Sequence, residues 1–129
     1  MRELWSMEGR YNRAKYFWIE VAMAVVVQVV AFIMGLAVGA AGGDPNAAAG
    51  LGAIVGILGA VIGAFPVVKR FHDLDRPGSH YWLLLIPIYN LYLGLVLLFK
   101  KGTLGSNKYG ADPLRAAGLQ PQNYDPALR

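Results

Sequence analysis

The sequence predicts an all-α membrane protein that consists of a glycine-packed antiparallel helical hairpin, a third transmembrane or re-entrant helical segment and a short interfacial helix at the amino terminus. Two observations predict this class. Hydrophobic residues make up 56% of the 129 residues, which is more than the core of a small soluble domain needs. Three long apolar runs account for the excess, at residues 19–41, 47–68 and 81–99. A helix rising about 1.5 Å per residue crosses about 30 Å of hydrocarbon in roughly 20 residues, a length that the third run only just reaches.

All three runs belong to one predicted domain, residues 1–113, and residues 114–129 are predicted to be a flexible tail. The chain has no cysteine, which excludes disulfides, thiolate metal sites and cysteine nucleophiles. Its formal net charge is +4, and the lysines and arginines stand beside the ends of the apolar runs. This placement favours anionic lipid head groups over nucleic acid as the partner. No resident cofactor is predicted.

Residues 7–18 are predicted to form the short interfacial helix that leads into the first apolar run. Arg10 and Arg13 lie one helical turn apart, and Trp18 stands at the lipid boundary, where aromatic residues are enriched. The first run is longer than the core of about 7–15 residues that a cleaved secretory signal has, so it is expected to remain as a membrane helix. Glu20 lies just inside this helix and is expected to form a salt bridge with a basic residue of the second loop.

A turn-forming cluster at residues 42–46 separates the first two runs and is too short for anything except a tight helical hairpin. Small residues recur every four positions in both predicted helices, which places them on one face of each helix. Small side chains let backbones approach closely, so these positions are predicted to pack the hairpin together or to join copies of the chain. The predicted packing residues are Gly35, Gly39, Gly43, Gly52, Gly56, Gly59 and Gly63.

The densest polar segment, Lys69–His80 with the sequence KRFHDLDRPGSH, lies between the second and third runs. Three interpretations of it stay open. In the first, Asp73 and Asp75 neutralise Arg70 and Arg76 beside the lipid, where an unpaired charge is costly. In the second, the basic side chains of the segment bind phosphate head groups. The third interpretation is catalytic.

In the catalytic interpretation His72 acts as a general acid or base while Asp73 and Asp75 hold a divalent metal ion. His72 and Asp73 are then the candidate catalytic residues. The segment lacks the paired histidines at helical spacing that zinc proteases use, and it has no phosphate-cradling glycine loop. Its spacing alone therefore does not separate catalysis from binding.

Basic residues near the run ends place the amino terminus and the Lys69–His80 segment on the cytoplasmic side of the membrane. The third run disturbs this agreement, because a crossing would put Lys100, Lys101 and Lys108 on the opposite side. The run either crosses the bilayer, or it bends at residues 87–90 and returns to the cytoplasmic side. A bend at membrane depth is tolerated where it lies in a polar layer or is lined by protein.

Three ordered polar segments resemble the motifs of a known family. EGRYNR at residues 8–13 resembles an opening GR-x-x-R motif, KRFHD at residues 69–73 a basic-basic-apolar-His-Asp motif, and NKYGADP at residues 107–113 a closing N-basic-aromatic-G-x-D-P motif. In this order they are similar to the domain-of-unknown-function 805 family (DUF805) of small bacterial inner-membrane proteins. PGSHY at residues 77–81 departs from the more usual serine–glycine–tryptophan run. The resemblance implies a multi-pass inner-membrane protein with a joint site made of the three segments, and it implies no reaction.

The predicted function is that of a structural or interaction protein that binds anionic lipid head groups or a partner through an Arg/His/Asp cluster at the membrane surface. The first alternative is a membrane-surface enzyme that acts on a phosphate-bearing lipid through His72. The second is an oligomeric transporter or channel subunit that uses Gln28, Tyr89 and Asn90. The predicted partners are membrane lipids and further copies of the chain, without nucleic acid. The predicted binding residues are Arg10, Arg13, Lys69, Arg70, His72, Asp73, Asp75, Arg76, Asn107 and Lys108.

Overall fold

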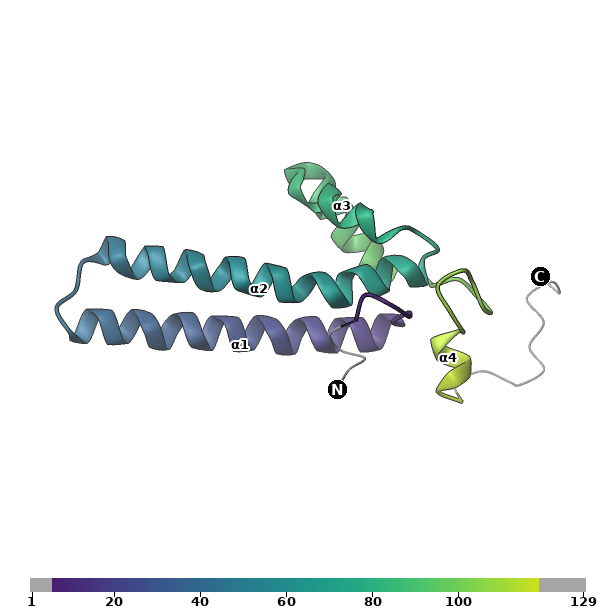
Figure 1. Cartoon of the computed structure of the whole chain (residues 1–129), viewed down its shortest axis with the longest axis horizontal. Helices are drawn as coiled ribbons and strands as arrows, with labels where there is room; N and C mark the ends of the chain where they lie inside the picture. The colour runs from purple at the N-terminus through teal and green to yellow at the C-terminus, as the bar shows by residue number, and fades with distance from the viewer. Residues whose placement is uncertain (1–5, 119–129) are drawn as a thin grey trace. The chain divides into compact units, whose positions relative to one another are not determined.

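The computed structural model of the chain describes residues 6–118, and apart from one isolated β-bridge every regular element in that range is helical (Figure 1). The described residues divide into two compact units. The hairpin unit is Ile19–Ala64, and the polar unit comprises residues 6–18 and 65–118. The elements are α1 (Arg13–Ala40), α2 (Pro45–Asp73), the 3₁₀ helix η2 (Gly78–Leu85), α3 (Pro87–Phe99) and α4 (Pro113–Ala116). The all-α class is confirmed, and α1 and α2 cover the first two apolar runs. α2 is longer than predicted, because it continues to Asp73 and so includes the start of the polar segment that was expected to be a loop.

The hairpin unit contains most of α1 and α2, which run antiparallel beside each other (Figure 1). Gly42 follows α1 with a φ of 66°, in the left-handed region that glycine adopts without strain. The N–H of Gly43 donates to the carbonyl of Val38 at 2.9 Å and so closes the end of α1. Asp44 caps α2, because its Oδ1 accepts from the N–H of Asn46 at 2.9 Å. The turn chemistry read from the sequence thus produces the short connection.

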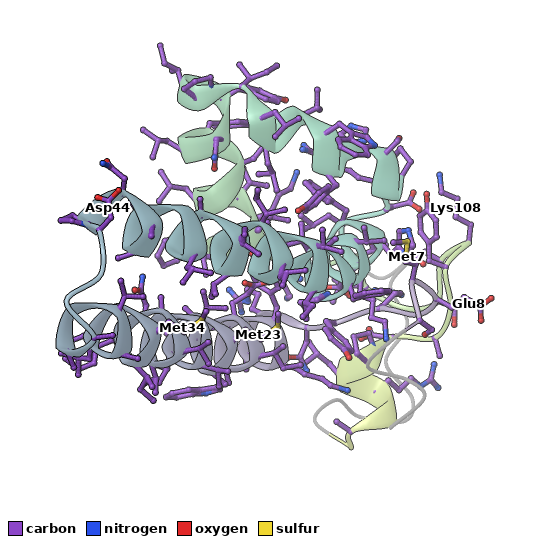
Figure 2. The ribbon with its side chains drawn as sticks, turned by 60° about the vertical axis from the view of Figure 1, so that its left-hand side comes forward. Met7, Glu8, Met23, Met34, Asp44 and Lys108 are labelled. Carbon is purple, nitrogen blue, oxygen red and sulfur yellow. The ribbon has the colours of Figure 1, made fainter. Side chains whose placement is uncertain are left out.

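One stripe of α1 lies against α2 in the hairpin unit, and Figure 2 shows Met23 and Met34 on that side. The other faces of both helices are apolar and exposed; Phe32 and Ile57, for example, are 66% and 65% exposed. Each helix is long and apolar enough to cross a membrane, and hydrocarbon suits such a surface. The stripe consists of half-buried residues at intervals of three or four: Met23, Val27, Ala31, Met34 and Val38.

The predicted packing glycines differ in their surroundings. A methyl group added at Gly59 would lie 2.8 Å from Cγ2 of Val27, so the two helices approach closely at this point. One added at Gly63 would lie 4.0 Å from Cε of Met23, while Gly43 faces its own turn. An added methyl would meet no described atom within 4 Å at Gly35, Gly39, Gly52 and Gly56. Packing at those four glycines, within the hairpin or between copies, stays a prediction.

The amino-terminal segment differs from the short interfacial helix that the sequence predicts. Residues 7–12 contain no helical turn. The N–H of Tyr11 donates to the carbonyl of Lys69 at 3.2 Å, which ties the segment to α2. Asn12 then caps α1 by accepting from the N–H of Lys15 at 2.8 Å, so the helix begins only after it. The prediction is wrong for residues 7–12, because a tertiary backbone contact and a helix cap set their conformation.

The third apolar run forms two helical pieces instead of one. η2 ends before Ile86, whose φ of −86° and ψ of 112° are extended, and α3 begins at Pro87. A residue that precedes proline disfavours the helical conformation, whereas proline itself fits the first position of a helix. The break therefore has a local cause, the proline at position 87.

Both ends of this segment, residues 78–99, contact the same end of α2. Near its start the ring of His80 lies 5.8 Å from the ring of Phe71. Near its finish the carbonyl of Leu97 accepts a hydrogen bond from Nε of Arg70 at 2.7 Å. The chain thus leaves the last turn of α2 and returns to it.

After α3 the chain forms a loop that ends in the short helix α4. Asn107 and Gly110 pair through two backbone hydrogen bonds of 3.0 Å and make a tight turn. Asp112 caps α4, because its Oδ1 accepts from the backbone N–H two residues further on at 2.9 Å. Of the residues predicted to be a flexible tail, 114–116 belong to α4, and 119–129 lie outside the described residues.

Candidate functional site

The last turn of α2 carries four charged or titratable residues that are all buried in the polar unit. The exposed fractions are 2% for Lys69, 0% for Arg70, 9% for His72 and 3% for Asp73. They follow directly on the apolar run 47–68, so they lie beyond the stretch that would cross a bilayer. Burial of this many ionisable groups is tolerated only where each has partners of opposite charge or hydrogen bonds.

α2 ends in this region, and Asp75 takes part in the backbone arrangement that ends it. The N–H of Asp75 donates to the carbonyl of His72 at 3.1 Å, and the N–H of Arg76 donates to that of Phe71 at 2.9 Å. Asp75 has a φ of 57°, in the left-handed region where glycine is the usual residue at a helix end. Pro77 follows and prevents a further turn. Asp75 therefore ends the helix, and its exposed carboxylate lies 4.0 Å from Nζ of Lys108.

The Asp73 carboxylate lies between two buried arginines. Its Oδ1 accepts from Nε of Arg10 at 3.1 Å and also lies 3.0 Å from Nη2 of the same side chain. Its Oδ2 accepts from Nη1 of Arg70, one helical turn earlier. Gly102 makes room for the carboxylate, because a methyl group at Gly102 would lie 1.9 Å from Oδ2. Asp73 is thus the shared counter-charge of two side chains that come from different segments.

Arg70 uses its remaining donors to hold the end of α3. Nε donates to the carbonyl of Leu97, and Nη2 donates to that of Lys100. The last carbonyls of a helix have no partner within the helix, so Arg70 satisfies two groups that α3 leaves open. Nη1 also donates to the carbonyl of Tyr11 at 3.3 Å. One fully buried side chain thus connects α2, α3 and the amino-terminal segment.

Arg10 holds the loop that follows α3. Nη1 donates to the carbonyl of Gly105 at 2.6 Å and to that of Gly110 at 3.3 Å. Nη2 donates to the carbonyl of Thr103. Because the guanidinium is a planar fork with five donors, it can bind a carboxylate and several carbonyls at once. Its pairing with Asp73 leaves it fully engaged inside the protein.

His72 joins the third polar segment to the other two. Its ring stacks on that of Tyr109 with centroids 3.9 Å apart and planes 2° from parallel. Nδ1 lies 3.3 Å from the carbonyl of Gly9, and since a carbonyl only accepts, the nitrogen donates. Nδ2 of Asn107 donates to the His72 carbonyl at 2.8 Å. The three segments that resemble family motifs therefore form one connected structure.

Burial sets the charge state of this histidine. Loss of solvation lowers the pKa of His72 from its ordinary value, and the positive charge of Lys108 acts in the same direction. The hydrogen bond with the carbonyl of Gly9 opposes the shift without cancelling it. At neutral pH the ring is consequently uncharged, which suits its contact with the face of Tyr109.

The predicted binding residues separate into an inner and an outer set. The inner residues Arg10, Arg70, His72, Asp73 and Asn107 are brought together by the contacts above. Lys69 is buried as well. The outer set is Arg13, Asp75, Arg76 and Lys108; Arg76 is partly exposed and the others are exposed. The inner arginines thus bind protein atoms, whereas the outer residues border solvent; ligand binding by either set stays a prediction.

Three contributors to the cluster are absent from the predicted binding residues, although the motif at residues 107–113 contains two of them. Gly102 is needed for space beside Asp73, and no local pattern marks it. Tyr109 stacks on His72, although the sequence presents it as a loop residue. Asp112 is 3% exposed, and besides capping α4 its Oδ2 accepts from the N–H of Gly105 at 2.9 Å. An aspartate followed by proline is a recognisable helix start, so this signal was available.

Within residues 6–118 no group of three or more metal-ligating side chains is placed to hold a metal ion. Both oxygens of Asp73 face arginines, and Asp75 points to solvent beside Lys108. The donor set of the catalytic interpretation is therefore not assembled among the described residues.

Two clefts open on the polar unit. The smaller has a volume of about 170 Å³, and Arg13, Asp73 and Lys101 are among its lining residues. The larger has a volume of about 710 Å³ and is bordered by residues 8–12, Lys15 and Lys69. Both clefts border the cluster and carry basic side chains.

Comparison with known proteins places the chain in a family. The sequence profile of a family described as "Protein of unknown function (DUF805)" matches residues 4–111. The inner membrane protein YhaI of Escherichia coli strain K12 is 41% identical over 46 residues, which cover 36% of this chain and 39% of that protein. The YhaI protein of Escherichia coli O157:H7 matches to the same extent. The alignment thus spans about two fifths of these curated relatives, and no solved structure matches the chain.

Proposed function

Since this chain belongs to the DUF805 family, we propose that it is an integral membrane protein whose polar unit forms a rigid surface for anionic lipid head groups. The buried cluster is the scaffold of that surface, because its arginines bind backbone carbonyls of three segments. The ligand-binding charges are the exposed ones around the cluster.

The observation that carries this proposal is the imbalance of exposed charge on the polar unit. Within residues 6–118 its exposed carboxylates are those of Glu8 and Asp75, whereas Asp73 and Asp112 are buried. The exposed basic residues of the polar unit, here called the basic rim, are Arg13, Lys15, Lys100, Lys101, Lys108 and Arg115. Anionic head groups attract a surface with this excess of positive charge by about 1 kcal/mol for each basic residue near the membrane.

The path of residues 78–99 supports a re-entrant segment within this proposal. α3 has 13 residues, and at about 1.5 Å per residue it spans about 20 Å, less than the roughly 30 Å of a hydrocarbon core. Both ends of the segment contact the last turn of α2. A crossing would have to separate those ends by the thickness of the bilayer.

The outward side chains of α3 suit hydrocarbon. Ile88 is 85% exposed, Leu91 72% and Phe99 70%. In the proposed arrangement this helix dips into the membrane from the side that carries the cluster and returns to it. The amino-terminal segment and residues 100–118 then share the cytoplasmic side, which agrees with their basic residues.

Topology is tested with a reporter that is active only outside the cytoplasm, fused after Arg129, and with a second fusion in the 42–46 turn. We expect an inactive reporter at the first position and an active one at the second. Activity at both positions would overturn the re-entrant path.

Lipid binding is tested with a variant of the full chain that carries Lys100→Gln, Lys101→Gln and Lys108→Gln, purified in mild detergent. We expect the co-purified phosphatidylglycerol to fall several-fold, because three exposed charges are lost. The matched control replaces the same lysines with arginine, which keeps the charge and should keep the lipid. Equal phosphatidylglycerol in the glutamine variant and the wild type would refute head-group binding by the rim.

The acid–base alternative has no geometric support among residues 6–118. His72 is 9% exposed, one face of its ring stacks on Tyr109, and Nδ1 faces the carbonyl of Gly9. These contacts support a role of the ring in packing and in the connection between segments.

A further inference from the structure

The side chain of Tyr11 has two positive charges over its ring. Nζ of Lys15 lies 4.4 Å from the ring centroid, and Nζ of Lys69 lies 4.7 Å from it. The second lysine also lies 3.5 Å from the tyrosine hydroxyl. A cation over an aromatic face is attracted by the ring, so Tyr11 positions both ammonium groups.

The backbone and the fold hold this arrangement in place. Tyr11 is 4% exposed and Lys69 is 2% exposed, and the Tyr11 N–H donates to the Lys69 carbonyl at 3.2 Å. Lys15 is exposed and stands in the first turn of α1, which Asn12 caps. The site therefore combines one ordered charge with one that can move toward a ligand.

These three residues line the larger cleft, whose volume of about 710 Å³ lies in the range of about 300–1,000 Å³ that ligand pockets have. Arg10, which is paired with Asp73, and Glu8 line the same cleft. Among the described lining residues the basic groups outnumber the carboxylates. Lys69 directly follows the apolar run 47–68, so the cleft belongs at the level of the head groups.

The two ammonium groups lie 4.4 and 4.7 Å from one ring centroid and repel each other, and an anion that contacts both adds attractions that outweigh this repulsion. An ammonium group is a compact point charge with three donors, and it binds phosphate oxygens without demanding a planar partner. We infer that this cleft binds the phosphate group of an anionic phospholipid between Lys15 and Lys69, with Tyr11 as the platform that positions them.

This inference rests on the proposed function but names a site that the basic-rim lysines do not form. The test titrates the full chain in detergent with phosphatidylglycerol and, as a neutral reference, with phosphatidylcholine. We expect Lys15→Gln to weaken phosphatidylglycerol binding about five-fold, the effect of losing one basic residue near anionic lipid. Lys15→Arg should restore the affinity, and phosphatidylcholine binding should not change.

Lys69→Gln should act in the same direction, and circular dichroism shows whether this buried variant folds. If it does not fold, the phosphatidylglycerol affinity of the Lys15→Gln variant alone decides the test. Wild-type affinity in Lys15→Gln would overturn the inference. If the Lys100, Lys101 and Lys108 glutamine variant still loses phosphatidylglycerol in that case, the proposed function stands and only the cleft assignment fails. Loss of lipid in neither variant would overturn both.

A soluble phosphate ester offers the same chemistry as the lipid, so glycerol 3-phosphate serves as the competitor. We expect it not to displace phosphatidylglycerol, because it lacks the acyl chains that hold the lipid beside the cleft. Displacement that depends on Lys15 to the same degree would overturn the assignment to a lipid.

Discussion

In the hairpin unit large apolar side chains point outward, whereas in the polar unit one of the most buried side chains is an arginine. Ile57 is 65% exposed and Arg70 is 0% exposed. In the helices of the hairpin unit the backbone N–H and C=O groups bond to each other, so these helices need only a lipid environment and a short connecting turn. The polar unit instead joins loops whose carbonyls have no regular partners, and charged side chains supply them. The apolar surface of the hairpin unit thus suits a lipid environment, while hydrogen bonds from charged side chains hold the loops of the polar unit together.

The largest effect is expected where the polar unit loses its shared counter-charge. Asp73→Asn leaves Arg10 and Arg70 buried without a carboxylate, and breaking a buried pair in this way costs about 3–5 kcal/mol of unfolding free energy. Trypsin should then cut after Lys100 and Lys101, because the loop loses its attachment. Unfolding in mixed micelles and limited proteolysis measure the two effects.

Asp75→Gly is the matched control for this prediction. Glycine adopts the left-handed conformation of residue 75 without strain, so the stability should stay within about 0.5 kcal/mol of the wild type. If Asp73→Asn behaves like this control, the counter-charge role of Asp73 is wrong.

A smaller loss is expected when space is removed beside the same carboxylate. In Gly102→Ala the added methyl would lie 1.9 Å from Oδ2 of Asp73, and overpacking of this kind costs about 1–3 kcal/mol. Gly94→Ala is the control, since a methyl there meets no described atom within 4 Å and alanine favours a helix by about 0.5–1 kcal/mol. Thermal unfolding of both variants in detergent distinguishes them, and equal midpoints would contradict the contact with Asp73.

In the hairpin unit the corresponding effect should be weaker. Gly59→Ala brings a methyl to 2.8 Å from Cγ2 of Val27, whose β-branched side chain has little rotamer freedom in a helix, and we expect a loss of about 1 kcal/mol. Gly56→Ala meets no described atom within 4 Å and should gain the roughly 0.5–1 kcal/mol by which alanine favours a helix. The double variant Gly59→Ala with Val27→Ala should recover part of the loss. No recovery would show that the close approach lies elsewhere.

The smallest effect concerns pH. The pKa of His72 is lower in the folded protein than in the unfolded chain, so the unfolded chain binds more protons in the interval between the two values. The stability that His72 contributes is therefore complete above the unfolded pKa of about 6.5 and declines as the pH falls below it. His72→Phe retains the stack on Tyr109 and should flatten this dependence. Melting temperatures measured from pH 7.5 to pH 5 test it, and parallel profiles would contradict it.

Features that depend on neighbouring residues were predictable from the sequence. Apolar runs predicted α1 and α2, and residues 42–46 predicted the turn because glycine, aspartate and proline have local conformational preferences. A bend at residues 87–90 was one of two paths left open for the third run, and the conformational preference of a residue before proline explains the observed break. The prediction of an interfacial helix was wrong at residues 7–12, because the hydrogen bond between Tyr11 and Lys69 joins positions far apart in the sequence. Local conformational preferences carry no information about such a distant partner.

The two long apolar helices, their hairpin turn and the three polar motifs follow from the order of residues along the chain, because composition and turn chemistry are local properties. Which charges are buried depends on contacts between segments that are distant in the sequence. Arg10 and Asp73 are 63 residues apart, and nothing local distinguishes Arg10 from the exposed Arg13. The return of residues 78–99 to α2 was likewise decided by Arg70, whose fixed fork of donors reaches the carbonyls at the end of α3. A buried charge requires partners in three dimensions, and these contacts separate the buried arginines from the basic residues that stay exposed.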